Sequence, residues 1–97
     1  MSTTAIDIGT LVVTTPETYG GRPRIAGTRI SIAQIAVWHQ QGMSPEAILE
    51  EISYLNLAQI YAALSYYHAN RKEIEADLAA ELAEYERLEA DRRAGRI

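Results

Sequence analysis

The amino-acid sequence predicts a mainly helical protein: a short N-terminal β element, a compact core of three helices and a long C-terminal helix. Helix-start signals recur three times between residues 31 and 70, each followed by apolar residues at helical spacing. The following segment is rich in Ala, Glu and Arg and has no Pro or Gly until Gly95. We therefore divide the chain into an N-terminal arm (1–30), a tri-helical core (31–70) and a C-terminal helix (71–97).

The N-terminal arm contains the predicted β element. Residues 11–15 are rich in β-branched side chains and are expected to form a short strand that stops at Pro16. Further short extended pieces are expected at 24–26 and 28–30, and such strands need to pair with one another or with another chain. Residues 1–10 are small and polar, and we expect them to fray.

Residues 20–30 are unusual because they combine three glycines, one proline and three arginines, a third of all Lys and Arg in the chain. This composition predicts one defined turn. The stretch is not a phosphate-binding P-loop, because no lysine follows Gly27 and Pro23 lacks a backbone donor. Its cations, Arg22, Arg24 and Arg29, are candidates for contacting DNA or a protein partner. Alternatively, each arginine has a structural use, such as pairing of Arg29 with a glutamate of the core.

The three helices of the core each begin with an N-cap residue, namely Ser31, Ser44 and Asn56. Ser31 and Asn56 have glutamine at the third helical position, which predicts a capping box, and Ser44 is followed by proline. Gly42 is expected to close the first helix. The predicted buried faces are Ile32, Ile35, Ala36 and Trp38 or His39; Ile48, Leu49 and Ile52; and Leu57, Ile60, Tyr61, Leu64 and Tyr67.

The C-terminal segment continues the apolar helical pattern. Either the third helix runs on to about Arg93, or it breaks near residues 68–70 and a fourth helix follows. The stripe is longer than the small core can cover, so its outer half is expected to dock on another protein. The residues predicted to contact this partner are Ile74, Leu78, Leu82, Tyr85, Leu88, Arg92, Arg93 and Arg96. The arginines at the end also suit the helix dipole, and they would then simply remain in solvent.

The composition favours a non-enzymatic protein without cofactor or metal. The chain has no cysteine, its two histidines are far apart in sequence, and no catalytic constellation is apparent. The net charge is −4 and residues 31–70 contain no Lys or Arg, so any DNA contact should depend on the arm and not on the third helix. The sequence has no signal peptide and no apolar run long enough to span a membrane, which predicts a cytoplasmic protein.

Several ordered motifs resemble one bacterial family, domain of unknown function 433. They are Gly21-Arg22-Pro23, Ile25-Ala26-Gly27-Thr28-Arg29-Ile30, Gly42-Met43-Ser44-Pro45-Glu46, Leu57 and Ala63-Leu64-Ser65-Tyr66-Tyr67. Members of this family are similar to VapB-type antitoxins that pair with PIN-like ribonuclease toxins. The resemblance implies a non-catalytic regulator with a homeodomain-like core of the helix-turn-helix type.

The resemblance leads to one principal function and two alternatives. The principal one is the antitoxin of a type II toxin–antitoxin system, which neutralises a PIN-like ribonuclease toxin and autoregulates its operon by binding operator DNA. By family analogy, the C-terminal arginines would reach the acidic metal site of the toxin. The alternatives are a stand-alone DNA-binding transcriptional regulator and a structural adaptor. A homodimer is expected, because the core is small, the strands are short and the apolar stripe is long.

Overall fold

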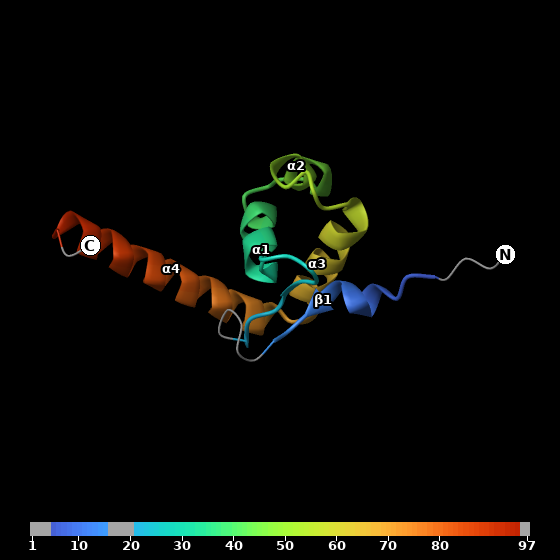
Figure 1. The fold of residues 1–97 in the computed structure, drawn as a ribbon, viewed down its shortest axis with the longest axis horizontal. Coiled ribbons are helices and arrows are strands. Elements are labelled where there is room, and N and C mark those ends of the chain that lie inside the picture. Colours follow the sequence, from blue (N-terminus) through green and yellow to red (C-terminus); the bar gives the residue numbers. More distant parts are fainter. Residues whose placement is uncertain (1–4, 16–20, 96–97) are drawn as a thin grey trace.

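The computed structural model describes residues 5–15 and 21–95, and it confirms a mainly helical fold with a short two-stranded sheet and a long C-terminal helix (Figure 1). The elements are η1 (Ile8–Leu11), β1 (Val12–Val13), β2 (Arg24–Ile25), α1 (Ile32–Gln40), α2 (Pro45–Glu51), α3 (Leu57–Ala69) and α4 (Arg71–Arg93). The predicted stop at Pro16 lies outside the described residues, as does Arg96.

The N-terminal arm forms a small antiparallel sheet in which Val12 pairs with Ile25 and Val13 with Arg24. The predicted strand 11–15 is shorter than expected, and residues 8–11 form a 3₁₀ turn instead of fraying. The reason is local: the Asp7 carboxylate accepts a hydrogen bond from the Gly9 N–H at 2.9 Å and caps this turn.

The segment between β2 and α1 is a tight turn, not the extended piece predicted for residues 28–30. The Ile25 N–H donates to the Ile30 carbonyl at 2.9 Å, and the Thr28 hydroxyl donates to the Ile25 carbonyl at 2.8 Å. Gly27 has φ 76°, a left-handed conformation that favours glycine. The Ile32 N–H then donates to the Pro23 carbonyl, which fixes the turn to the first residue of α1.

The three predicted N-caps are confirmed. Ser31, Ser44 and Asn56 each accept a hydrogen bond from a backbone N–H in the first turn. The full reciprocal capping box forms at Asn56, where the Gln59 side chain also accepts from the Asn56 N–H at 2.8 Å. Gly42 has φ 90° directly after α1, as expected for a glycine that ends a helix.

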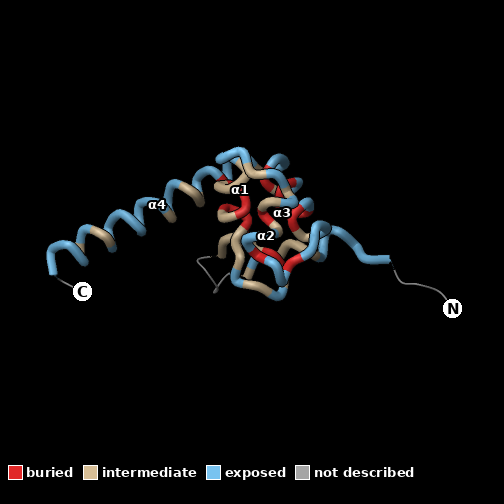
Figure 2. The backbone as a smooth tube through the Cα atoms, turned by 90° about the horizontal axis from the view of Figure 1, so that it is seen from above, coloured by how far each residue is buried: buried red, intermediate tan, exposed pale blue. Residues whose placement is uncertain are grey.

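The core lies where α1 packs on α3, and α2 and β2 each pack against both helices. Figure 2 shows the buried residues gathered on these helices, while most of α4 is exposed. The predicted buried faces of the first two helices are largely confirmed, although Trp38, His39 and Leu49 are only half-buried. The predicted face of α3 is partly wrong. Leu57 and Tyr61 are exposed, while Ala62 and Ala63 are buried. Small alanine side chains at the interface let two helices approach closely, and larger apolar residues beside them then face outward.

The helix is interrupted between α3 and α4 at Asn70, whose backbone leaves the helical region (φ −132°, ψ 45°). Ile74, in the first turn of α4, is fully buried in the core, and Leu78 is half-buried against it. Beyond the contacts that Glu81 and Glu84 make with the arm, α4 projects away from the rest of the described molecule (Figures 1 and 2). The predicted boundary at residue 70 therefore coincides with the helix break, but the packed core continues into α4.

Candidate functional site

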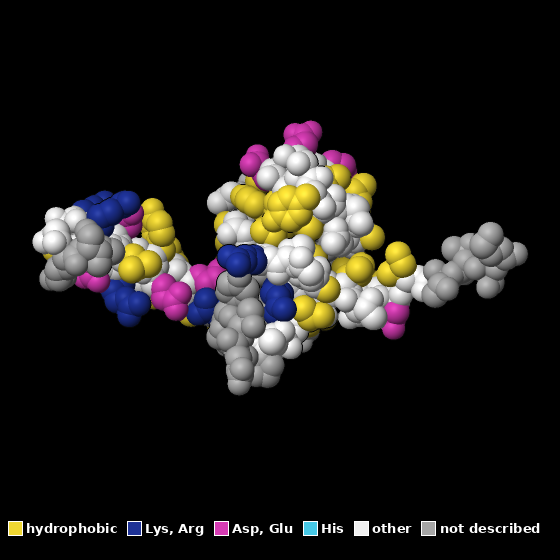
Figure 3. Space-filling view, in the orientation of Figure 1, with side chains coloured by type: hydrophobic (Ala, Val, Ile, Leu, Met, Phe, Trp, Pro, Cys, Tyr) yellow, Lys and Arg dark blue, Asp and Glu magenta, His cyan; other side chains and the backbone are white. Residues whose placement is uncertain are grey.

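The three arginines of the arm line one cavity, which we call the arginine cleft. It has a volume of about 470 Å³ and lies between the arm, the N-terminus of α1 and the middle of α4. Figure 3 shows basic side chains gathered beside acidic ones where α4 leaves the core. The polar residues that line the cleft are Arg22, Arg24, Arg29, Ser31, Gln34, Glu81 and Glu84.

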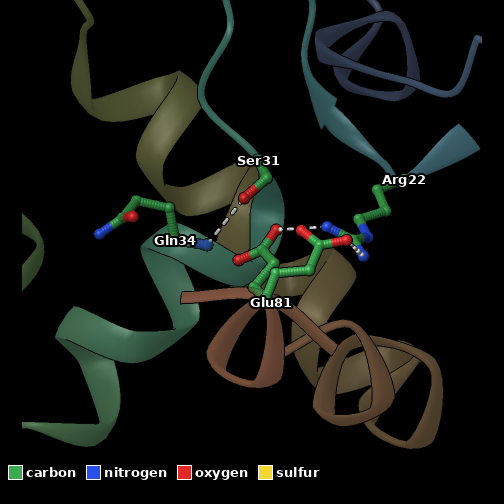
Figure 4. Close-up of polar contacts among 5 residues, drawn as sticks. Arg22, Ser31, Gln34 and Glu81 are labelled. Carbon is green, nitrogen blue, oxygen red and sulfur yellow. Dashed lines mark hydrogen bonds and ion pairs between the residues drawn. The ribbon is translucent and has the colours of Figure 1, made fainter. Parts of the chain in front are cut away.

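Arg22 is held by α4. Its guanidinium lies 3.6 Å from a carboxylate oxygen of Glu81 and 3.6 Å from one of Glu84, and its side chain is 22% exposed. Figure 4 shows Arg22 and Glu81 pointing toward each other below Ser31. A structural use of one arm arginine was among the predicted alternatives, but the partners are glutamates of α4 and not of the core. The pairs fasten the arm to α4.

Arg24 and Arg29 make fewer polar contacts than Arg22 does. One guanidinium nitrogen of Arg24 donates to the Thr15 hydroxyl at 2.9 Å, which leaves its other N–H donors for further partners. Arg29 is exposed, and within residues 5–15 and 21–95 it makes no hydrogen bond or ion pair. The structure thus brings together the three arginines predicted to contact DNA, and their contact with DNA stays a prediction.

Glu81 is the half-buried acid of the cleft. Desolvation raises its pKa above the ordinary value of 4.5, and the attraction of Arg22 and a hydrogen bond from Ser31 only partly offset this. Asp77, one turn earlier on α4, also has a raised pKa, again mainly because of desolvation. The ionised form of Glu81 is therefore less favourable in the folded protein than in the unfolded chain.

The raised pKa of Glu81 predicts a pH-dependent stability. An acid whose pKa is raised on folding adds stability that is fully present below its unfolded value, and this stability is lost as the pH rises through the folded value. Glu81→Gln should therefore equal or exceed the wild type in unfolding free energy at pH 7. The difference should shrink as the pH falls toward 4.5. Urea unfolding of both proteins at several pH values tests this, and a Gln variant that is clearly less stable at pH 7 contradicts it.

The second candidate surface is the projecting part of α4. Leu82, Tyr85 and Leu88 follow one another at helical spacing and are 57%, 62% and 51% exposed. We call these three residues the α4 face. Two members of the predicted partner-binding stripe do not belong to it: Ile74 is fully buried and Leu78 half-buried, because the first turns of α4 pack on the protein's own core.

The predicted C-terminal cations are only partly available. Arg92 pairs with Glu89 one turn earlier, while Arg93 is exposed at the end of α4. Arg96 lies outside the described residues. Of the two C-terminal arginines that the structure describes, Arg93 is therefore more accessible to a partner than Arg92.

A further polar cluster surrounds Tyr67, and its contacts are those of side chains packed between helices. The Tyr67 hydroxyl accepts hydrogen bonds from Gln40 at 3.0 Å and Arg71 at 3.5 Å, and His39 and His68 lie against one another with ring centroids 5.2 Å apart. In the part of the chain that the structure describes, no group of three or more potential metal ligands gathers. No described helix is both long and apolar enough to cross a membrane.

Sequence reasoning missed the role of Glu81 and Glu84. Their spacing of three places both carboxylates on one side of α4. That signal was present, but the side of α4 that faces the arm depends on how α4 leaves the core at Asn70, which local sequence does not specify.

The fold and its surfaces define a small tri-helical protein that presents an arginine cleft and a projecting helix with exposed apolar residues. The family described as Protein of unknown function (DUF433) matches residues 12–67, and the chain belongs to this family. A crystal structure of a DUF433 member from Anabaena variabilis is similar, with a TM-score of 0.67 and 30% sequence identity over 72% of this chain and 69% of that one. The chain matches no curated protein. α4 follows the family segment, so the α4 face lies outside it.

Proposed function

We propose that this chain is the antitoxin of a type II toxin–antitoxin pair and binds a PIN-like ribonuclease toxin through the α4 face. The observation that carries the proposal is the exposure of Leu82, Tyr85 and Leu88 on a helix that projects beyond the core. A helix with exposed apolar residues at helical spacing is suited to a hydrophobic groove on a partner. Complete burial of a large apolar side chain contributes roughly 1.5–3 kcal/mol, and each of these three side chains has more than half of its surface left to bury.

The charges near the helix end are compatible with the same proposal. Arg93 is exposed one turn after the α4 face, and Arg92 lies beside it. Guanidinium groups form strong, often bidentate, bonds with carboxylates. In the proposed complex these arginines lie near the acidic metal site that PIN-like nucleases are expected, by family analogy, to have. The protein itself acts without catalysis, by covering that site.

Co-expression with the product of the adjacent reading frame tests this function. If that frame encodes a PIN-like nuclease, the two proteins should purify together, and the complex should cleave RNA much more slowly than the free nuclease. Co-purification with a catalytically inactive nuclease variant shows that binding does not depend on nuclease activity. Two proteins that elute separately, with RNA cleavage unchanged by the chain, contradict the proposal.

The alternative of a stand-alone DNA-binding regulator has weaker support. A helix-turn-helix protein places its third helix in the major groove and neutralises phosphates with nearby cations. α3 has no Lys or Arg, and α2 carries Glu46, Glu50 and Glu51. The arginine cleft is the observation that favours contact with phosphate, and its ligand is a separate question.

A further inference from the structure

We propose that the arginine cleft is a binding site for a phosphate group carried by a nucleotide or by a nucleic-acid strand. The proposal does not rest on the antitoxin function, and the cleft is lined by other residues of α4 than those of the α4 face. No phosphate-binding backbone motif is present in the sequence, so the site consists of side chains. Arg22 lies just before β2, Arg24 lies in β2 and Arg29 lies in the turn that follows, and α4 borders the cleft on the other side.

The hydrogen-bonded turn between β2 and α1 holds the backbone near the arginines in one conformation. Its hydrogen bonds at Ile25, Thr28 and Ile30 and its attachment to α1 fix the backbone on both sides of Arg29. Arg24 lies in β2, where the sheet and a bridge to Ser31 hold it. The guanidinium groups of Arg24 and Arg29 are thus attached to a preformed frame, so binding of a ligand requires little additional ordering of the backbone there.

The number of arginines favours phosphate over carboxylate. One guanidinium can satisfy a carboxylate through a bidentate pair, whereas a phosphate has additional oxygens that accept from several guanidinium groups at once. Three arginines line this cleft, and α1 directs its N-terminal end, with partial positive charge, toward the same place at Ser31 and Gln34. A volume of about 470 Å³ also exceeds what a lone ion needs and falls within the range of small-ligand pockets.

Glu81 and Glu84 act as internal substitutes for the ligand. Both carboxylates lie 3.6 Å from Arg22, longer than the approximately 2.7–2.9 Å of a tight charge-assisted hydrogen bond. Long ion pairs that remain partly open to solvent contribute modest stability. A phosphate therefore displaces them from Arg22 at small cost, while the repulsion of the two glutamates limits its affinity.

Titration calorimetry of the full chain with AMP, adenosine and a short DNA duplex tests the site. AMP or the duplex should bind and adenosine should not. Binding of AMP alone identifies a free nucleotide as the source of the phosphate, and binding of the duplex alone identifies a nucleic-acid strand. Failure of both to bind, or equal binding of adenosine and AMP, overturns the proposal.

Two pairs of matched variants locate the binding. Arg29→Ala should weaken it at least about tenfold, because a hydrogen bond to a charged group is lost, while Arg87→Ala on the projecting part of α4 should not. Glu84→Gln should strengthen it about two- to fivefold by removing a competing carboxylate, while Glu86→Gln, outside the cleft, should not. If the two variants of either pair change the affinity equally, the ligand is attracted only by the overall charge of the protein. That result also overturns the proposed site.

Discussion

Replacing Ile74 by alanine should lower the free energy of unfolding by about 2–5 kcal/mol, whereas Leu88→Ala should change it by less than about 0.5 kcal/mol. Both residues belong to α4 and to the same predicted stripe. Ile74 is fully buried and its truncation leaves a cavity among α1, α3 and α4. Leu88 is 51% exposed, so its truncation leaves no cavity in the core.

Urea unfolding followed by circular dichroism measures both changes, because loss of helix reports the global transition. Equal destabilisation by the two substitutions would mean that α4 folds on the core along its whole length. A negligible effect of Ile74→Ala would mean that α4 is not anchored at all. The expected contrast also sets the design of any truncation: a protein that ends at Asn70 loses Ile74 and Leu78, so it tests folding and not partner binding.

The helix boundaries could be predicted from sequence because capping is local. Ser31, Ser44 and Asn56 each bond to a backbone group only three residues away, so the residues that decide each helix start are adjacent in the chain. The turn at Gly27 was predictable for the same reason. The 3₁₀ turn after Asp7 is equally local, but its small polar surroundings were interpreted as a frayed terminus.

The buried face of α3 and the partners of Arg22 were not predictable, because both depend on tertiary packing. Helical spacing alone cannot distinguish a face with Leu57 and Tyr61 from the adjacent face with Ala62 and Ala63. Which face is buried depends on how closely α1 approaches. The contact of Arg22 with α4 depends likewise on the helix break near Asn70, a choice that the sequence left open.

The α4 face should dominate binding of the proposed toxin. Changing Leu82, Tyr85 and Leu88 together to glutamine should weaken the complex by more than about 100-fold, since buried interface anchors each contribute about 2 kcal/mol or more. Unfolding free energy should stay within about 0.5 kcal/mol of wild type, because exposed positions away from the core tolerate polar substitution. Surface plasmon resonance with the immobilised nuclease measures the affinity.

A matched control separates the apolar face from helix composition. Ala80→Gln, Ala83→Gln and Ala90→Gln introduce the same three glutamines on the opposite side of the same exposed helix, and should leave affinity within about threefold. Sedimentation of wild type and both triple variants shows whether the α4 face also pairs two copies of the chain. If the control weakens binding as much as the face variant does, α4 contributes only its helical structure, and the contact surface must lie on the core or the arm.

The two arginines in the last turn of α4 should contribute more to inhibition of the nuclease than to binding. Arg92→Ala with Arg93→Ala removes the two described cations at the end of α4 and leaves the apolar anchors intact. If these cations cover an acidic metal site, inhibition of RNA cleavage should fall by at least about tenfold while affinity falls much less, because the lost charge-assisted bonds are only part of the contact. Equal losses of affinity and inhibition would mean that the arginines contribute binding energy alone, and that the nuclease is blocked by the bulk of the helix.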